Sequence, residues 1–227
     1  RFWGDPHFEG GDGGLFDVQG EPNTTFNLLT DKGLVYDGLF IPGDPPGVTL
    51  VGRTMLRLSS EGKQSLILFE PRKDIATIDG KPITASGEST ADGGVTYAKG
   101  KDIETRTAEG YLITQHFRKG GGPWPRYIDA EVTTGAKGVS ADGVRPGGLL
   151  GQTFDADSDR RDGKRGKGAQ GEGAIDGVYT DYMLERQSGF DEWFYLATYA
   201  DVSAAVDRGE FSSGKHHYDT YGIQEAR

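Results

Sequence analysis

The chain has 227 residues, of which 34% are hydrophobic and 37 are glycine, so its apolar core must be modest and its turns numerous. With 35 acidic and 25 basic residues the formal net charge is −10, which would repel a phosphate backbone and disfavours nucleic-acid binding. The sequence contains no cysteine, which excludes disulfides and thiolate chemistry, and no run of about 20 apolar residues that could span a membrane.

Residues 15–132 consist of short runs in which apolar and polar residues alternate, as in FDVQGEPNTTFNLLTDKGLVYDGLFI, separated by turn residues. Alternation with period two over such short runs is typical of half-buried β-strands. Asp79-Gly80 between two runs predicts a hairpin, and Asp92-Gly93-Gly94 predicts another. We therefore expect a mainly β protein, built as an antiparallel β-sandwich or a curled sheet.

The composition changes in the last third of the chain. Residues 162–173 read DGKRGKGAQGEG, without an apolar side chain larger than alanine, which predicts a flexible linker or a mobile loop. Apolar residues then recur at helical spacing between Tyr195 and Val206, Gly209 ends this pattern, and Ser212 or Ser213 can cap a second short helix. The expected domains are a β domain over 1–162, a Gly/Lys-rich linker or loop over 163–189, and a small helical appendage over 190–227.

An acidic stretch reads DADSDRRDG from residue 155 to residue 163. Oxygen ligands at alternate positions of a tight loop can converge on Ca²⁺, which takes six to eight oxygens at about 2.3–2.6 Å. An EF-hand is excluded, because its glycine and glutamate positions hold Arg160 and Gly166. A solvated acidic loop without an ion is the alternative. The candidate calcium ligands are Asp155, Asp157, Asp159 and Asp162.

The sequence GDPH near the start contains a bond that can break without an external enzyme. The carboxylate of Asp5 can attack its own carbonyl carbon and expel the nitrogen of Pro6, which must then receive a proton. His7 is the nearby group that titrates near neutral pH, so it is the candidate proton donor. The alternative is structural: Asp5 caps a turn, Pro6 fixes its backbone, and His7 packs at the start of the first strand.

Three blocks of this sequence resemble the von Willebrand factor type D domain. They are GDPHF, DGGLFDVQG and, much later, GGLLGQTFDADSD, in the family order over residues 3 to 160. The resemblance implies a cation site that also draws on the N-terminal block, so Asp12 or Asp17 would complete the calcium site. The chain departs from the animal members at their cysteine positions, which here hold Glu21 or Pro22 and Leu150.

The segment WGDPHF is also similar to the opening of bacterial metal-ion-inducible autocleavage domains. These domains, like certain mucin type D domains, are cut within GDPH after the aspartate, whereas many other type D domains carry GDPH and stay intact. Residues 190–227 resemble a short repeat of large bacterial secreted and surface proteins. The resemblance implies a module that is secreted or on the cell surface, whose partners are calcium and other domains or copies of a parent surface protein.

Two functions are therefore expected as alternatives. The first is calcium-dependent self-cleavage at Asp5–Pro6, with no activity on external substrates, since G-x-S-x-G, H-E-x-x-H and P-loop patterns are absent. The second is a structural or adhesive module of a surface protein or filament, stabilised by calcium.

Overall fold

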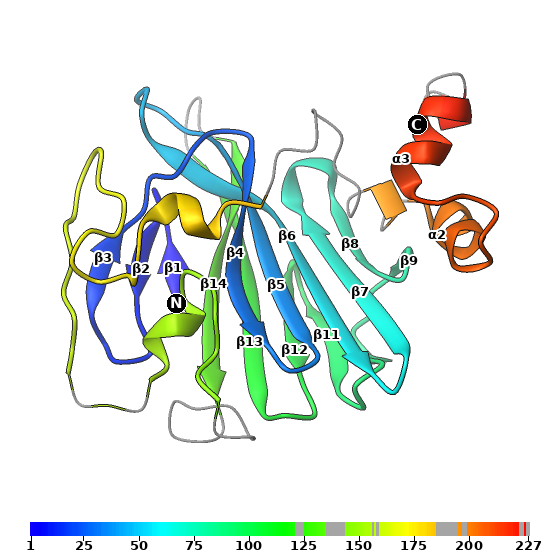
Figure 1. Cartoon of the computed structure of the whole chain (residues 1–227), viewed down its shortest axis with the longest axis horizontal. Helices are drawn as coiled ribbons and strands as arrows, with labels where there is room; N and C mark the ends of the chain where they lie inside the picture. The colour runs from blue at the N-terminus through cyan, green and yellow to red at the C-terminus, as the bar shows by residue number, and fades with distance from the viewer. Residues whose placement is uncertain are drawn as a thin grey trace.

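The chain folds into two antiparallel β-sheets that face each other, followed by a small helical tail (Figure 1). This arrangement, in a computed structural model, confirms the expected mainly β class, and of the two expected forms it is the sandwich. The structure describes residues 1–120, 125–134, 144–155, 157, 159–184, 195–196, 199–222 and 225.

The larger sheet has the strand order β10-β11-β12-β13-β14-β1-β2-β3. The N-terminal strands thus extend a meander that forms in the middle of the chain, because β1 pairs with β14. The bounds are β1 Phe2–Trp3, β2 His7–Glu9, β3 Leu15–Asp17, β10 Glu88–Ser89, β11 Val95–Lys99, β12 Asp102–Arg106, β13 Tyr111–Lys119 and β14 Arg126–Thr134.

The smaller sheet has the order β4-β5-β6-β7-β8-β9 and is a simple meander. Both hairpins expected from glycine-containing turns are confirmed: Asp79-Gly80 connects β8 to β9, and residues 90–94 connect β10 to β11. The bounds are β4 Thr24–Asp31, β5 Leu34–Pro42, β6 Thr49–Ser60, β7 Lys63–Glu70, β8 Ile75–Ile78 and β9 Lys81–Pro82; the short 3₁₀ turns are η1 Pro71–Lys73, η2 Gly151–Thr153 and η3 Tyr179–Tyr182.

The core lies between the sheets and draws on both. Tyr36 and Leu56 of the smaller sheet belong to the same buried cluster as Ile113 and Ile128 of the larger sheet. The phenol of Tyr36 donates a hydrogen bond to Gln115 Oε1 across the interface, at 3.2 Å. Burial raises the pKa of Tyr36, so this group stays protonated and the bond joins the two layers.

Residues 163–171, which we call the strap, lie along β3. Gly163 N donates to Leu15 O at 2.9 Å, and the main chain of Asp17 donates to Lys164 O at 3.1 Å and accepts from Gly171 N at 2.8 Å. Of the two alternatives for the glycine-rich stretch, the described part is therefore a loop of the β domain and not a linker that leaves it. Small side chains allow this close approach, and Ala169 is fully buried.

The helical tail lies at the end of the molecule away from β1–β3 (Figure 1). It contains α2 Ala200–Asp207, α3 Gly214–His217 and a π-helical turn, η4 Tyr218–Gly222. The expected cap is confirmed at Ser213, whose hydroxyl accepts a hydrogen bond from His216 N. Tyr195 is buried in the tail, with its hydroxyl 3.0 Å from Nδ1 of His217.

Among the described residues, no helix combines the length and the apolar character that crossing a membrane requires.

Candidate functional site

The Asp5–Pro6 bond lies in the tip of the first hairpin. Trp3 of β1 pairs with His7 of β2, so residues 4–6 form the connecting loop. Gly4 adopts φ +60°, a conformation that favours glycine, and proline is suited to the loop because it has no N–H to donate. The structure thus confirms that GDPH forms a turn at the start of the fold, and the turn does not exclude a reaction there.

The N-terminal side of this turn is fixed to the neighbouring strand β14. Gly4 N donates to Oδ1 of Asp129 at 2.9 Å. The other oxygen of Asp129 accepts from Arg118 Nε at 2.5 Å, so the carboxylate is itself held in place. No sequence motif drew attention to Asp129, since the pairing of β1 with β14 brings it to the turn from more than a hundred residues away.

Both carbonyl oxygens next to the Asp–Pro bond accept hydrogen bonds. Gln19 Nε2 donates to the main-chain oxygen of Asp5 at 3.2 Å. Val18 N donates to the oxygen of Pro6, also at 3.2 Å. The residues on either side of the bond are therefore oriented by one short segment that follows β3.

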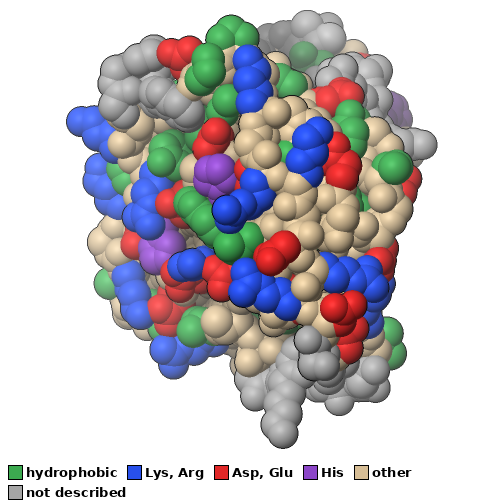
Figure 2. Space-filling view, turned by 90° about the vertical axis from the view of Figure 1, so that its left-hand side faces the viewer, with side chains coloured by type: hydrophobic (Ala, Val, Ile, Leu, Met, Phe, Trp, Pro, Cys, Tyr) green, Lys and Arg blue, Asp and Glu red, His purple; other side chains and the backbone are tan. Residues whose placement is uncertain are grey.

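The imidazole of His7 lies between two carboxylates. Its Nδ1 is 2.7 Å from Oδ1 of Asp17, and its Nε2 is 3.0 Å from Oδ1 of Asp5. In the protonated form both nitrogens donate, and in the neutral form with the proton on Nδ1 the Nε2 lone pair faces Asp5. The Asp5 side chain is 38% exposed and so reachable by water, whereas that of Asp17 is 1% exposed. The face that carries β1–β3 has histidine at its surface among intermixed acidic and basic side chains (Figure 2).

Strand register explains why these groups meet. His7 pairs directly with Asp17 in the β2–β3 ladder, and paired residues point to the same face of the sheet. Gln19 follows Asp17 by two residues, and this spacing along an extended chain keeps both on one side. No motif assigned a role to Gln19. Its spacing of two residues from Asp17 within FDVQG is the sequence signal that places both side chains on the same side.

The strap completes the surroundings of Asp17. Gly166 N donates to Oδ2 of Asp17, so both carboxylate oxygens have partners. Asp17 was expected as an additional calcium ligand, but the structure places it against His7 and the strap.

The opening block and the late acidic stretch are neighbours, as the resemblance implied. Asp12 accepts from Gly14 N at 2.9 Å and from Arg161 N at 3.0 Å. Leu15 N donates to Oδ1 of Asp162 at 2.9 Å. This bond, together with the guanidinium of Arg160, lowers the pKa of Asp162.

The remaining acidic residues form local turns. Asp157 N donates to Asp155 Oδ1 at 3.3 Å, and Asp159 N donates to Asp157 Oδ1 at 2.7 Å. Within the described part of the chain, no three carboxylate or imidazole groups are placed to hold one metal ion. The donors that Asp12 and Asp162 find are backbone N–H groups and arginine, so this arrangement does not fit a preformed calcium site.

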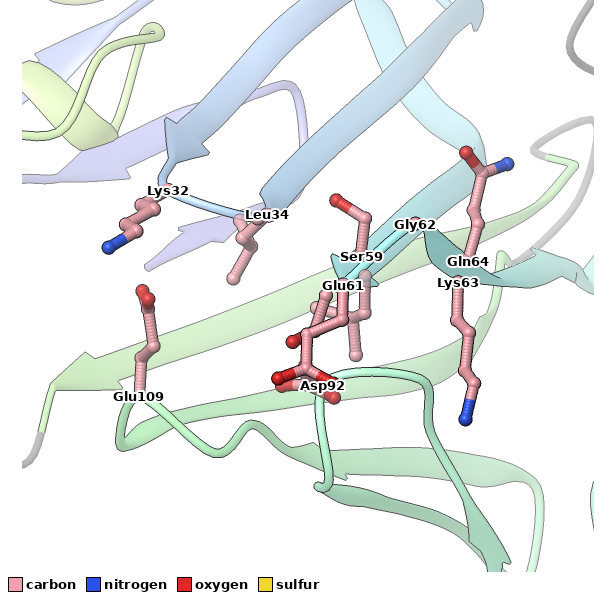
Figure 3. A pocket seen from close by; sticks show the side chains of 12 residues that line it. Lys32, Leu34, Ser59, Glu61, Gly62, Lys63, Gln64, Asp92 and Glu109 are labelled. Atoms are coloured by element: carbon pink, nitrogen blue, oxygen red, sulfur yellow. The ribbon is translucent and has the colours of Figure 1, made fainter.

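A pocket of about 640 Å³ lies elsewhere, at the turns β4–β5 and β6–β7. Figure 3 shows acidic and basic side chains among those that line it, including Lys32, Glu61, Asp92 and Glu109. Its lining includes neither GDPH nor its partners, and no histidine. The pocket is therefore separate from the candidate site.

Comparison with known proteins does not assign this chain to a family. No family model matches the chain, and no curated protein matches it either. The candidate site is defined by its own contacts, those among Asp5, His7, Asp17 and Gln19.

Proposed function

We propose that this chain cleaves its own peptide bond between Asp5 and Pro6. The observation that carries the proposal is the position of His7, whose Nε2 lies 3.0 Å from the Asp5 carboxylate while Asp17 fixes its other nitrogen. A nucleophile and a proton donor thus lie next to the same bond. Holding reacting groups in one turn replaces a bimolecular encounter by an intramolecular one, which can lower a barrier by several kcal/mol, on the order of 7–11 in favourable cases.

In the first step a carboxylate oxygen of Asp5 attacks the carbonyl carbon of the same residue. A C–O bond forms, and the carbonyl π electrons move to the main-chain oxygen. As this tetrahedral intermediate collapses, the C–N bond to Pro6 breaks and the nitrogen takes a proton from the imidazolium of His7. The products are a five-membered cyclic anhydride at Asp5 and a free secondary amine at Pro6.

In the second step water opens the anhydride. Its oxygen adds to one anhydride carbonyl, one of its protons returns to the imidazole of His7, and Asp5 becomes a C-terminal residue with two carboxyl groups. The net reaction consumes one water molecule and needs no cofactor. Water can reach the intermediate, because the Asp5 side chain is 38% exposed.

The setting of this reaction is part of the proposal. The motifs in GDPHF, FDVQG and residues 147–159 support a type D-like module of a secreted or surface protein, acting beside other domains or copies of that protein. Calcium would be held by the loop aspartates Asp155, Asp157 and Asp159 after they are drawn together, with Asp162 or Asp12 as a further ligand, since both oxygens of Asp17 are engaged by His7 and Gly166. The reacting groups of both steps are those of Asp5, Pro6, His7 and water, and calcium would act by ordering the domain around them.

The test uses the full chain with a tag added upstream of Arg1 and follows intact mass over time. Two fragments are expected, whose masses add up to the starting mass plus one water. Asp5→Ala and His7→Ala should each suppress them. Hydroxylamine added during the reaction should convert the new C-terminus of Asp5 to a hydroxamate, because it traps an anhydride.

The chain supplies an internal control, since Asp44–Pro45 is a second Asp–Pro bond. Asp44 and Pro45 are exposed, and Pro46 occupies the position that His7 has in the first motif. Cleavage at residue 5 with residue 44 intact is the expected pattern. Equal cleavage at both bonds would indicate ordinary acid lability, and an unchanged mass at every pH tested would leave the structural or adhesive module as the remaining function.

A further inference from the structure

We infer that Gln19 is a catalytic residue of this reaction, whose side-chain amide stabilises the negative charge that develops on the main-chain oxygen of Asp5. The inference rests on the proposed self-cleavage and assigns a group that the cleavage chemistry otherwise lacks. Attack on the carbonyl carbon turns a neutral oxygen into an oxyanion, and hydrogen bonds to charged acceptors are roughly twice as strong as neutral ones. A donor that is already in place therefore favours the transition state over the ground state.

The amide is aimed at the reacting atom. Gln19 Nε2 lies 3.2 Å from the Asp5 oxygen, a long ground-state hydrogen bond that can shorten as the oxygen acquires charge. Gln19 is 3% exposed, so little water competes with it. In such dry surroundings a fixed dipole interacts more strongly with a developing charge than it would in solvent.

The position of Gln19 is fixed on both sides of its backbone. Its N–H donates to Ala169 O of the strap at 2.9 Å, and its carbonyl oxygen accepts from the hydroxyl of Thr49 in β6. The residue is thus clamped between the strap and the smaller sheet. Its amide does not have to reorganise when the oxyanion forms, which is the property that makes such donors effective.

The oxygen of the same amide shows that the orientation of the Gln19 side chain lowers the stability of the fold. Among the described residues, Gln19 Oε1 is buried and has no hydrogen-bond partner. Rotating the amide by 180° would place Oε1 against the Asp5 oxygen, so that two acceptors would face each other. A buried acceptor without a partner destabilises a fold, and an apolar side chain of the same size would avoid that cost. A donor role toward Asp5 explains why an amide occupies this position.

The experiment compares the cleavage rate and the melting temperature of Gln19→Met with those of the unaltered chain. Methionine keeps the length of the side chain and removes both the donor and the unpartnered acceptor. We expect the rate to fall by about 10²–10³, as when one oxyanion donor is removed, and the melting temperature to stay equal or rise. A purely structural glutamine would give the opposite: a lower melting temperature with the cleavage rate unchanged.

A second variant and a control complete the design. Gln19→Asn keeps an amide but shortens the side chain by one methylene group, so the donor no longer reaches the Asp5 oxygen and the rate should also fall; it decides the matter if Gln19→Met does not fold. Gln115→Met removes another buried glutamine, one that accepts from Tyr36 between the sheets. It should lower the melting temperature and leave the cleavage rate unchanged.

The outcomes separate the inference from the proposed function. If the unaltered chain cleaves at residue 5 and a folded Gln19 variant cleaves as fast, the role of Gln19 is overturned and self-cleavage stands. If the unaltered chain does not cleave, both fall together. Slow cleavage in both Gln19 variants with normal melting curves supports both.

Discussion

Nδ1 of His7 lies 2.7 Å from Oδ1 of Asp17, a carboxylate that is almost completely buried. The contact orients the ring, because a buried carboxylate needs a charged or hydrogen-bonding partner. It leaves the second ring nitrogen directed at Asp5. In the proposed cleavage Asp17 is therefore a positioning residue, which acts on the bond through His7.

Asp17→Asn should slow cleavage at least about tenfold, since the amide removes the negative charge that fixes the imidazolium. ¹⁵N NMR of the His7 ring provides an independent readout. The spectra are recorded in an Asp5→Ala background, in which the chain stays intact. They should show that Asp17→Asn weakens the hydrogen bond made by the Nδ1 proton of His7. The matched control is Asp12→Asn, which removes a carboxylate near the same strands that does not contact His7. Equal rates for both variants would contradict the role of Asp17.

Gly163→Val should displace the strap, loosen its packing on Phe16 and Ala174 at the edge of the core, and slow cleavage. A Cβ at this position would lie 2.8 Å from Ala174 Cβ and 2.9 Å from Phe16 Cβ, closer than real contacts allow. Asp17 would then lose the bond from Gly166 N. The measurement is the cleavage rate together with hydrogen exchange of the β3 amides, which should become less protected. Gly62→Ala in the β6–β7 turn is the control: it strains the backbone at φ +77° but meets no atom within 4 Å, and it should leave the rate unchanged.

Calcium is expected to raise the melting temperature of the chain relative to the same protein in chelator, because an ion that binds only the folded state stabilises it. Asp157→Asn should remove the effect, since Asp157 connects Asp155 and Asp159 through hydrogen bonds in the acidic loop. Melting curves in calcium and in chelator test this directly. Superimposable curves would exclude a calcium site in this loop, and the cleavage proposal would be unaffected.

Acid should destabilise the larger sheet through Glu104 on β12. Burial alone would raise the pKa of this carboxyl, but hydrogen bonds from Lys99, Tyr97 and Arg106 outweigh it and lower the pKa to about 2. The stabilisation is complete above the unfolded value of 4.5 and is lost as the pH falls from there toward about 2. Urea unfolding at about pH 6 and pH 3 should show a smaller loss of unfolding free energy for Glu104→Gln than for the unaltered chain. An identical loss would show that other carboxylates dominate.

The sheets could be predicted from the sequence because their signals are local. Alternation with period two and the Asp-Gly turns indicate strands and hairpins within a few residues, and Asp79-Gly80 forms the turn that its type predicts. The cap at Ser213 is equally local, since its partner is three residues away.

The candidate site was predictable only in part. GDPH indicated Asp5, Pro6 and His7, because the groups expected to take part in cleavage of the Asp–Pro bond are adjacent in the sequence. Asp129 reaches the turn through the pairing of β1 with β14, a long-range contact that no local pattern reports. The glycine-rich strap has the composition of a linker. Only its hydrogen bonds to β3 show that it is a loop of the β domain.

The strap makes the candidate site depend on a segment that lies late in the chain. The bond at residue 5 precedes the strap in the chain, but the groups that orient Asp17 and Gln19 come from Lys164, Gly166 and Ala169. A growing or truncated chain that ends before the strap lacks these contacts. Under the proposed reaction the N-terminal segment stays attached until the whole sandwich is built, so that release of this segment would report a finished domain.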